Sequence, residues 1–162
     1  MEDFLLSVHV LAAIVLVGGS AIATSLFPRY VPVAAGVPAA PAAEDAYAGP
    51  PEPPGERNRA VAVALHRVTR GYGIVGIVVP LAGLALAGMQ GRMGEIWITV
   101  SIVLTAAAGL LLALLIAPRQ RAALDEPDDG ARLRGLSMTS GIYNLLWAVV
   151  VVLMIIRPGS AT

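Results

Sequence analysis

The sequence predicts an all-α membrane protein in which four helices cross the bilayer and pack as an up-down four-helix bundle. Hydrophobic residues make up 57% of the 162 residues and charged residues only 14%, whereas a soluble domain has about a quarter charged residues. The charged residues are missing from four long blocks and crowded between them. A helix of roughly 20 residues crosses a hydrocarbon core of about 30 Å. Because hydrocarbon offers no partner to backbone amides and carbonyls, blocks of this length are expected to be helical.

The first predicted span covers residues 4–27. The small residues Ala21 and Ala23 resemble a signal-peptide cleavage site, but Glu2 and Asp3 make the segment before the apolar run acidic where a signal peptide is basic. The apolar run is also longer than the roughly 7 to 15 apolar residues of a signal peptide. We therefore expect this segment to remain in the protein as a transmembrane helix.

Residues 28–58 form a predicted flexible loop, on the cytoplasmic side, between the first and second spans. The loop holds eight of the twelve prolines together with many alanines, and a segment of this composition buries too little apolar surface to fold. Asn58 is of a residue type that caps helix N-termini. It is therefore expected to start a helix that continues into the second span, residues 68–91.

The second span contains Gly71, Gly73 and Gly76 in the spacing of the dinucleotide-binding fingerprint GxGxxG. That fingerprint has meaning only after a β-strand. Here a helix precedes it, so we interpret the glycines as small residues that allow close helix packing. Pro80 has no N–H to donate to the carbonyl of Gly76, which predicts a kink between Gly76 and Pro80.

The third and fourth spans, residues 96–117 and 135–156, are joined by a predicted cytoplasmic loop over residues 118–134. A layer of polar and amphipathic side chains is expected near the middle of the membrane, by the rise of about 1.5 Å per helical residue. Because an asparagine amide facing lipid would lack partners, this layer is expected to face the bundle interior or a second subunit, for packing or as the lining of a ligand cavity. Its members are Ser20, Thr105, Ser140, Asn144 and Trp147.

The arginines predict the orientation of the chain. Nine of the eleven lie in the two longer connections between charge-free blocks, five between Phe27 and Gly71 and four between Ala117 and Gly135. Cytoplasmic loops are the ones enriched in arginine. Both connections are therefore expected in the cytoplasm of a bacterial cell, with the spans in the inner (plasma) membrane and both termini outside the cytoplasm. Arg59, Arg67 and Arg70 are expected to anchor the second span, since each arginine near anionic lipid contributes about 1 kcal/mol.

Composition excludes several kinds of function. The chain has no cysteine and no lysine, which excludes thiolate metal sites, thiol nucleophiles, Schiff bases and P-loop lysines. Its net charge of zero gives no reason to expect nucleic acid as a partner. The acidic run at residues 125–130 could begin a calcium-binding loop at Asp125. Its third position would then be Pro127 and its twelfth Leu136, and neither side chain carries the oxygen ligand that such a loop needs there. No nucleophile or acid–base pair can be assembled from side chains at one depth, which favours a non-enzymatic function.

His9 is the most suggestive single residue, because ionisable groups inside a membrane are rare and are candidates for function. The predicted topology brings Met89, Met93 and Met154 to the same outer level. Thioethers with an imidazole suit Cu(I), and a His/Met pair also ligates haem iron. His66 lies on the opposite side of the membrane, so one iron cannot bind both histidines. Copper or haem at His9 is thus one hypothesis; the other is a neutral histidine bonded to a carbonyl, with no cofactor.

The segment from Ser7 to Gly19 carries His9 one turn in and ends in Val-Gly-Gly. In this it resembles a group of bacterial four-span integral membrane proteins of unknown function. It is more distantly similar to the membrane domain of copper-resistance D proteins and to the four-helix membrane protoporphyrinogen oxidase, whose Pro-Arg-aromatic step resembles residues 28–30. The resemblance implies a four-span fold and an important histidine at position 9. The oxidase pattern also includes an intramembrane lysine, and this chain has no lysine. Only His9 is therefore carried over by position.

Three functions remain open from the sequence. The preferred one is a non-enzymatic component that packs with itself, as a homo-oligomer, or with a larger membrane complex. The second is a copper- or haem-handling protein that uses His9 and the outer methionines. The third is a small transporter or lipid-binding protein that uses the polar layer around Asn144.

Overall fold

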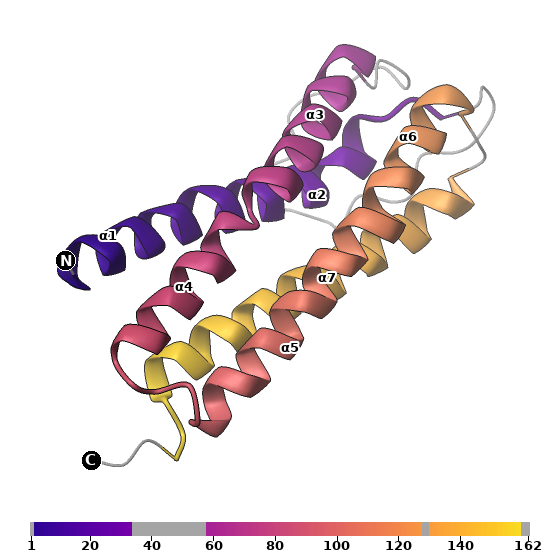
Figure 1. The fold of residues 1–162 in the computed structure, drawn as a ribbon. Helices are drawn as coiled ribbons and strands as arrows, with labels where there is room; N and C mark the ends of the chain where they lie inside the picture. The colour runs from indigo at the N-terminus through magenta and orange to yellow at the C-terminus, as the bar shows by residue number, and fades with distance from the viewer. Residues whose placement is uncertain (1, 34–57, 128–129, 160–162) are drawn as a thin grey trace, which may run out of the picture.

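The computed structural model describes residues 2–33, 58–127 and 130–159. Every regular element in these ranges is helical and no strand occurs in them, which confirms the all-α fold (Figure 1). The elements are α1 (Glu2–Ala12), the π-helical segment η1 (Ala13–Val17), α2 (Gly18–Tyr30), α3 (Arg59–Val75), α4 (Val78–Met89), α5 (Ile96–Leu110), the π-helical segment η2 (Leu111–Ile116), α6 (Ala117–Asp125) and α7 (Ala131–Ile156).

Joined end to end, these elements form four long helices, each with the length and apolar composition of a membrane span. They cover Asp3–Tyr30, Arg59–Met89, Ile96–Asp125 and Ala131–Ile156. Large apolar side chains such as Ile74 and Ile155 are 70% and 75% exposed, as expected for a surface that faces lipid rather than water. By length and composition the chain is a multi-pass membrane protein.

The helices extend beyond the predicted spans. The first continues to Tyr30, the third continues to Asp125 and the fourth begins at Ala131. Residues 28–30 of the first predicted connection, and residues 118–125 and 131–134 of the other, are therefore helical. Charged residues mark where the membrane ends, but alanine, leucine, glutamine and arginine all favour continuation of the helix. Most of the predicted flexible loop, residues 34–57, lies outside the described residues. The predicted cap is confirmed, because the Asn58 side chain accepts hydrogen bonds from the amides of Ala60 and Val61 at 3.0 and 3.3 Å.

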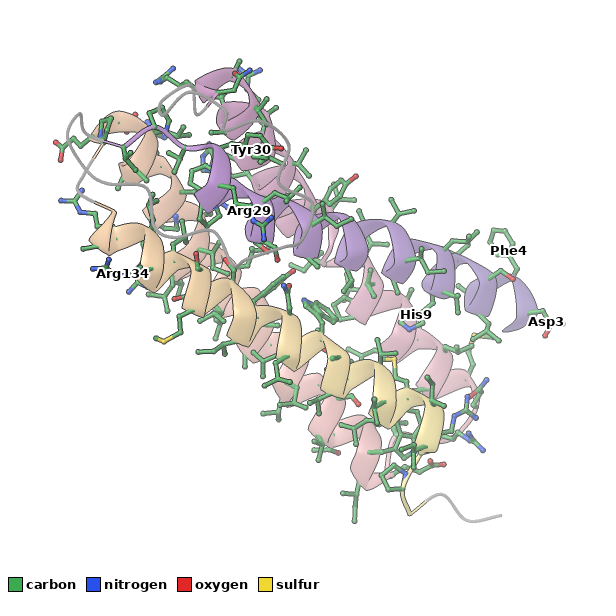
Figure 2. The ribbon with its side chains drawn as sticks, turned by 180° about the vertical axis from the view of Figure 1, so that it is seen from behind. Asp3, Phe4, His9, Arg29, Tyr30 and Arg134 are labelled. Atoms are coloured by element: carbon green, nitrogen blue, oxygen red, sulfur yellow. The ribbon has the colours of Figure 1, made fainter. Side chains whose placement is uncertain are left out.

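The bundle has two different ends. At the arginine-rich end, α2 and α6 finish and α3 and α7 begin; the terminal end holds the start of α1 and the finish of α7 (Figure 1). Figure 2 shows Arg29, Tyr30 and Arg134 at the first end, and Asp3 and Phe4 at the second. The N-terminal part of α1 lies apart from α5 and α7 in both views. The largest buried cluster, which includes Phe27, Ile116 and Leu136, lies toward the arginine-rich end.

The second long helix is interrupted at Gly76 and Ile77, between α3 and α4. Pro80 has no N–H, and the carbonyl of Gly76 instead accepts from the amide of Val79 at 3.1 Å. A Cβ at Gly76 would lie 2.4 Å from the carbonyl oxygen of Tyr72, so the tight turn requires glycine there. The interruption lies at the positions where the sequence predicts a kink.

Small residues let the helices approach closely at three points. A Cβ at Gly19 would lie 2.0 Å from the ring of Tyr72, one at Gly73 would lie 3.3 Å from Leu112, and one at Gly83 would lie 3.0 Å from the ring of His9. These contacts join α2 to α3, α3 to η2, and α4 to α1. Where lipid supplies no hydrophobic drive, such close packing is a main source of helix association.

Candidate functional site

A buried hydrogen bond joins the first turn of α2 to the middle of α7. Ser20 Oγ lies 2.7 Å from the hydroxyl oxygen of Tyr143 and donates its own proton to the carbonyl of Val17 at 2.9 Å. The Tyr143 hydroxyl therefore donates to Ser20. Tyr143 also packs edge-on against Trp147, with ring centroids 6.4 Å apart. Tyr143 was absent from the predicted polar layer, although its place one turn from Ser140 and Trp147 on the same helix is a signal that sequence reasoning could have used.

The same layer reaches the surface at Asn144, near the midpoint of α7. Asn144 Nδ2 donates to Ser25 Oγ at 2.8 Å. The pair lies in a shallow groove of about 320 Å³ between α2 and α7, hereafter the α2–α7 groove, whose lining includes the 61% exposed Ile22. The groove is lined by Ala21, Ile22, Ser25, Leu26 and Asn144.

Several atoms of the predicted layer are buried without a partner among the described residues. They are the side-chain oxygens of Ser140 and Asn144 and the indole N–H of Trp147. Thr105 is half-buried on α5 and makes no side-chain hydrogen bond to any residue that the structure describes. The structure thus joins α2 to α7 through two separate bonds, Ser20 to Tyr143 and Asn144 to Ser25. It leaves Thr105, Ser140 and Trp147 outside these bonds.

His9 lies in the contact between α1 and α4 (Figure 2). It is only 8% exposed, and its Nδ1 lies 3.0 Å from the carbonyl oxygen of Val79. A carbonyl only accepts, so Nδ1 carries the proton and donates it. In the neutral ring Nε2 then keeps a lone pair. Gly83 leaves room for the ring, because any Cβ there would press on Cε1.

The three methionines predicted at the level of His9 lie on different elements from it. Met89, at the end of α4, is half exposed, as is Met93 in the connection to α5, and Met154 is partly buried on α7. Met89 is six residues beyond Gly83, or about 9 Å along the helix axis. His9 itself meets α4 at Val79 and Gly83, closer to the middle of the second long helix.

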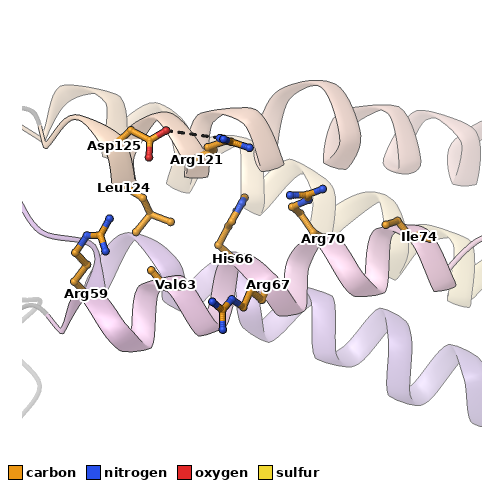
Figure 3. Close-up of a pocket in the computed structure, with 9 residues that line it drawn as sticks. All are labelled: Arg59, Val63, His66, Arg67, Arg70, Ile74, Arg121, Leu124 and Asp125. Atoms are coloured by element: carbon orange, nitrogen blue, oxygen red, sulfur yellow. Dashed lines mark ion pairs between the residues drawn. The ribbon is translucent and has the colours of Figure 1, made fainter.

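A larger groove of about 630 Å³, hereafter the arginine groove, lies between α3 and α6 at the arginine-rich end (Figure 3). Figure 3 shows Arg59, His66 and Arg70 pointing from α3 toward α6, whereas Arg67 points away from α6. Arg121 on α6 pairs with Asp125 at 3.7 Å. The lining residues are Arg59, Val63, His66, Arg67, Arg70, Ile74, Arg121, Leu124 and Asp125.

A buried polar network connects α3 and α6 beside this groove. His66 Nδ1 lies 3.1 Å from Gln120 Oε1, and Gln120 Nε2 donates to Thr69 Oγ1 at 3.3 Å. Thr69 in turn donates to the carbonyl of Leu65 at 3.0 Å. Gln120 and Thr69 are fully buried. Because each named hydrogen has an acceptor, the network fixes how α3 and α6 face each other.

The fold and these sites define a polytopic helical bundle with polar contacts inside its spans and a cationic groove at one end. Neither a protein-family model, a curated protein nor a solved structure matches the chain.

Proposed function

We propose that this protein is a non-enzymatic component of a bacterial inner membrane that packs with a second copy of itself or with a larger membrane complex. The observation that supports this proposal is the Asn144–Ser25 pair in the α2–α7 groove, near the midpoint of α7 and open to the lipid-facing surface. The proposed orientation places the arginine-rich end in the cytoplasm and both termini outside, because cytoplasmic segments are enriched in arginine.

A second helix suits the α2–α7 groove better than lipid does. Hydrocarbon offers no hydrogen-bond partner to the pair, whereas a polar side chain on another helix does, and such contacts contribute about 0.6 to 2 kcal/mol. Ala21 and Ser25 are small, so a neighbouring backbone can approach closely in the manner common to membrane helix interfaces.

Replacing Asn144 by leucine is expected to weaken self-association about 3- to 30-fold, which corresponds to the contribution of one such polar contact. The dimer fraction can be measured by fluorescence energy transfer between labelled copies in lipid bilayers. Thr99→Leu is the matched control, because Thr99 is exposed on α5 and lies outside the groove. An Asn144→Leu protein that associates as strongly as the wild type would contradict the proposal.

The absence of native cysteine allows a direct test of the surface involved. A single cysteine at Ile22, in the α2–α7 groove, should cross-link two copies on oxidation in the membrane. A single cysteine at Val103, which is similarly exposed on α5, should not. Equal cross-linking at the two positions would place the contact elsewhere.

A second candidate function, the handling of copper or haem iron at His9, is favoured by one bond. Histidines that bind metals usually donate their other ring N–H to a carbonyl, carboxylate or water. The Nδ1–Val79 contact matches this pattern and leaves Nε2 for a metal. The resemblance to copper-resistance D proteins and to the membrane oxidase points the same way. Met89, Met93 and Met154 would supply thioether ligands, which suit Cu(I) and haem iron.

If His9 binds copper or haem, the His9→Ala protein should lose the bound copper or the visible haem absorbance. His66→Ala, which removes the other histidine, should retain it. The measurement is metal analysis together with an absorbance spectrum of protein purified from its native membrane. Retention of the full signal in His9→Ala would exclude this candidate.

A further inference from the structure

We infer that the arginine groove binds the phosphate group of one anionic phospholipid molecule, with the acyl chains leaving past Ile74 into the bilayer. This site is separate from the α2–α7 groove, so the inference stands independently of the proposed self-association.

The charges of the arginine groove are unbalanced. Four arginines and one aspartate line it, and the aspartate pairs with Arg121. Arg59, Arg67 and Arg70 form no ion pair with any carboxylate among residues 2–33, 58–127 and 130–159. Like charges that line one groove repel each other, and a bound anion relieves the repulsion. Guanidinium groups suit phosphate in particular, because their planar N–H donors match two phosphate oxygens.

The groove crosses from a charged surface to an apolar one. Arg59, Val63, His66, Arg70 and Ile74 follow one another at three- or four-residue spacing, so they lie along one face of the second long helix over about 22 Å. The charge-free block of this helix begins directly after Arg70, and Ile74 is largely exposed. The cationic part therefore lies at the level of lipid headgroups and the apolar part at the level of acyl chains.

The groove also has a fixed polar floor. His66, which is nine-tenths buried, lines the groove and donates through Nδ1 to Gln120. In the neutral ring Nε2 then keeps a lone pair, which can accept a hydrogen bond from a lipid hydroxyl but donates none to the phosphate. Since Gln120 and Thr69 hold α3 against α6, arginines from two helices face the same space without rearrangement (Figure 3). A preorganised site of this kind loses little entropy when it binds.

A phospholipid fits better than a soluble anion for two reasons. The groove, at about 630 Å³, is much larger than a phosphate ion. It also contains Val63, Leu124 and Ile74, which contribute nothing to an inorganic ion but pack against the glycerol and the first methylenes of a lipid.

The test uses the full chain in nanodiscs of equimolar phosphatidylglycerol and phosphatidylcholine, followed by native mass spectrometry of the released protein. One retained phosphatidylglycerol per chain is expected for the wild type. Arg70→Gln and Arg121→Gln should each lower its retention about fivefold, the factor that corresponds to one arginine at an anionic surface. Arg134→Gln removes the same charge from an exposed position at the same end of the bundle, outside the groove, and should change retention less than twofold.

Three results would overturn the inference. Equal losses in all three variants would indicate general attraction to the membrane surface. Equal retention of phosphatidylcholine would remove the need for a negative lipid. Displacement of the lipid by millimolar inorganic phosphate would indicate a site for a soluble anion. Each variant's thermal stability in lipid-free detergent shows whether it is folded, and Arg70→Lys, which keeps the charge, should retain more lipid than Arg70→Gln.

Discussion

The Gly19→Ala protein is expected to be less stable than the wild type by about 1 to 3 kcal/mol, the usual cost of adding atoms to a packed contact. An added Cβ would lie 2.0 Å from Cε2 of Tyr72 and 2.9 Å from Cδ2. The ring or the helix that carries it must therefore move, and α2 then separates from α3. The free energy of unfolding can be measured by denaturation with sodium dodecyl sulfate in mixed micelles.

Gly18 provides a control one residue away. No atom lies within 4 Å of a Cβ built at Gly18, so Gly18→Ala adds no clash. It should raise stability by about 0.5 to 1 kcal/mol, because alanine favours the helix over glycine. Combining Gly19→Ala with Tyr72→Ala should recover part of the loss, since the clashing ring is then absent. If Gly18→Ala and Gly19→Ala had equal effects, the close approach of Tyr72 to α2 would be refuted.

We expect Phe27→Ala to lower the free energy of unfolding by about 3 kcal/mol, the low end of the range for a phenylalanine in a water-soluble core. Phe27 is 0% exposed and packs in the main buried cluster with Val31, Ala62 and Ile116. In lipid the side chain stays in apolar surroundings when the helices separate, so the loss comes mainly from the cavity and the missing packing contacts. The same micelle denaturation measures it.

The only other phenylalanine, Phe4, makes the matched comparison possible. Phe4 is 68% exposed, so Phe4→Ala should change stability by less than about 0.5 kcal/mol. Similar losses in the two variants would show that the buried cluster at the arginine-rich end does not hold the bundle together.

Much of the local structure could be predicted from the sequence. Apolar blocks of about 20 residues define helices because each backbone group in lipid must bond within its own helix. The Asn58 cap depends on atoms two and three residues away. The effect of Pro80 depends on a carbonyl four residues earlier. Each of these outcomes involves only nearby residues, and so their identities are enough.

The continuation of the third helix to Asp125 was missed for a related reason. Its last eight residues include three charged ones, which led to the prediction of a connection outside the membrane. In the structure α6 buries Gln120, Ala123 and Leu124. Charge determines which part of a helix can enter lipid, whereas a helix that packs against a neighbour, as α6 packs against α3 through Gln120, can continue beyond that part.

The sequence by itself determined the fold class, the four apolar helices and which residues are charged at each end. Only the tertiary structure decided that Ser20 meets Tyr143, that His66 meets Gln120, and that Arg70 faces Arg121 across one groove. These partners are separated by 51 to 123 residues. Whether two such side chains meet depends on how far each helix is rotated about its own axis. The π-helical segments η1 and η2 change this rotation for the first and third long helices. That rotation follows from how all the helix surfaces pack together, and no local pattern contains it.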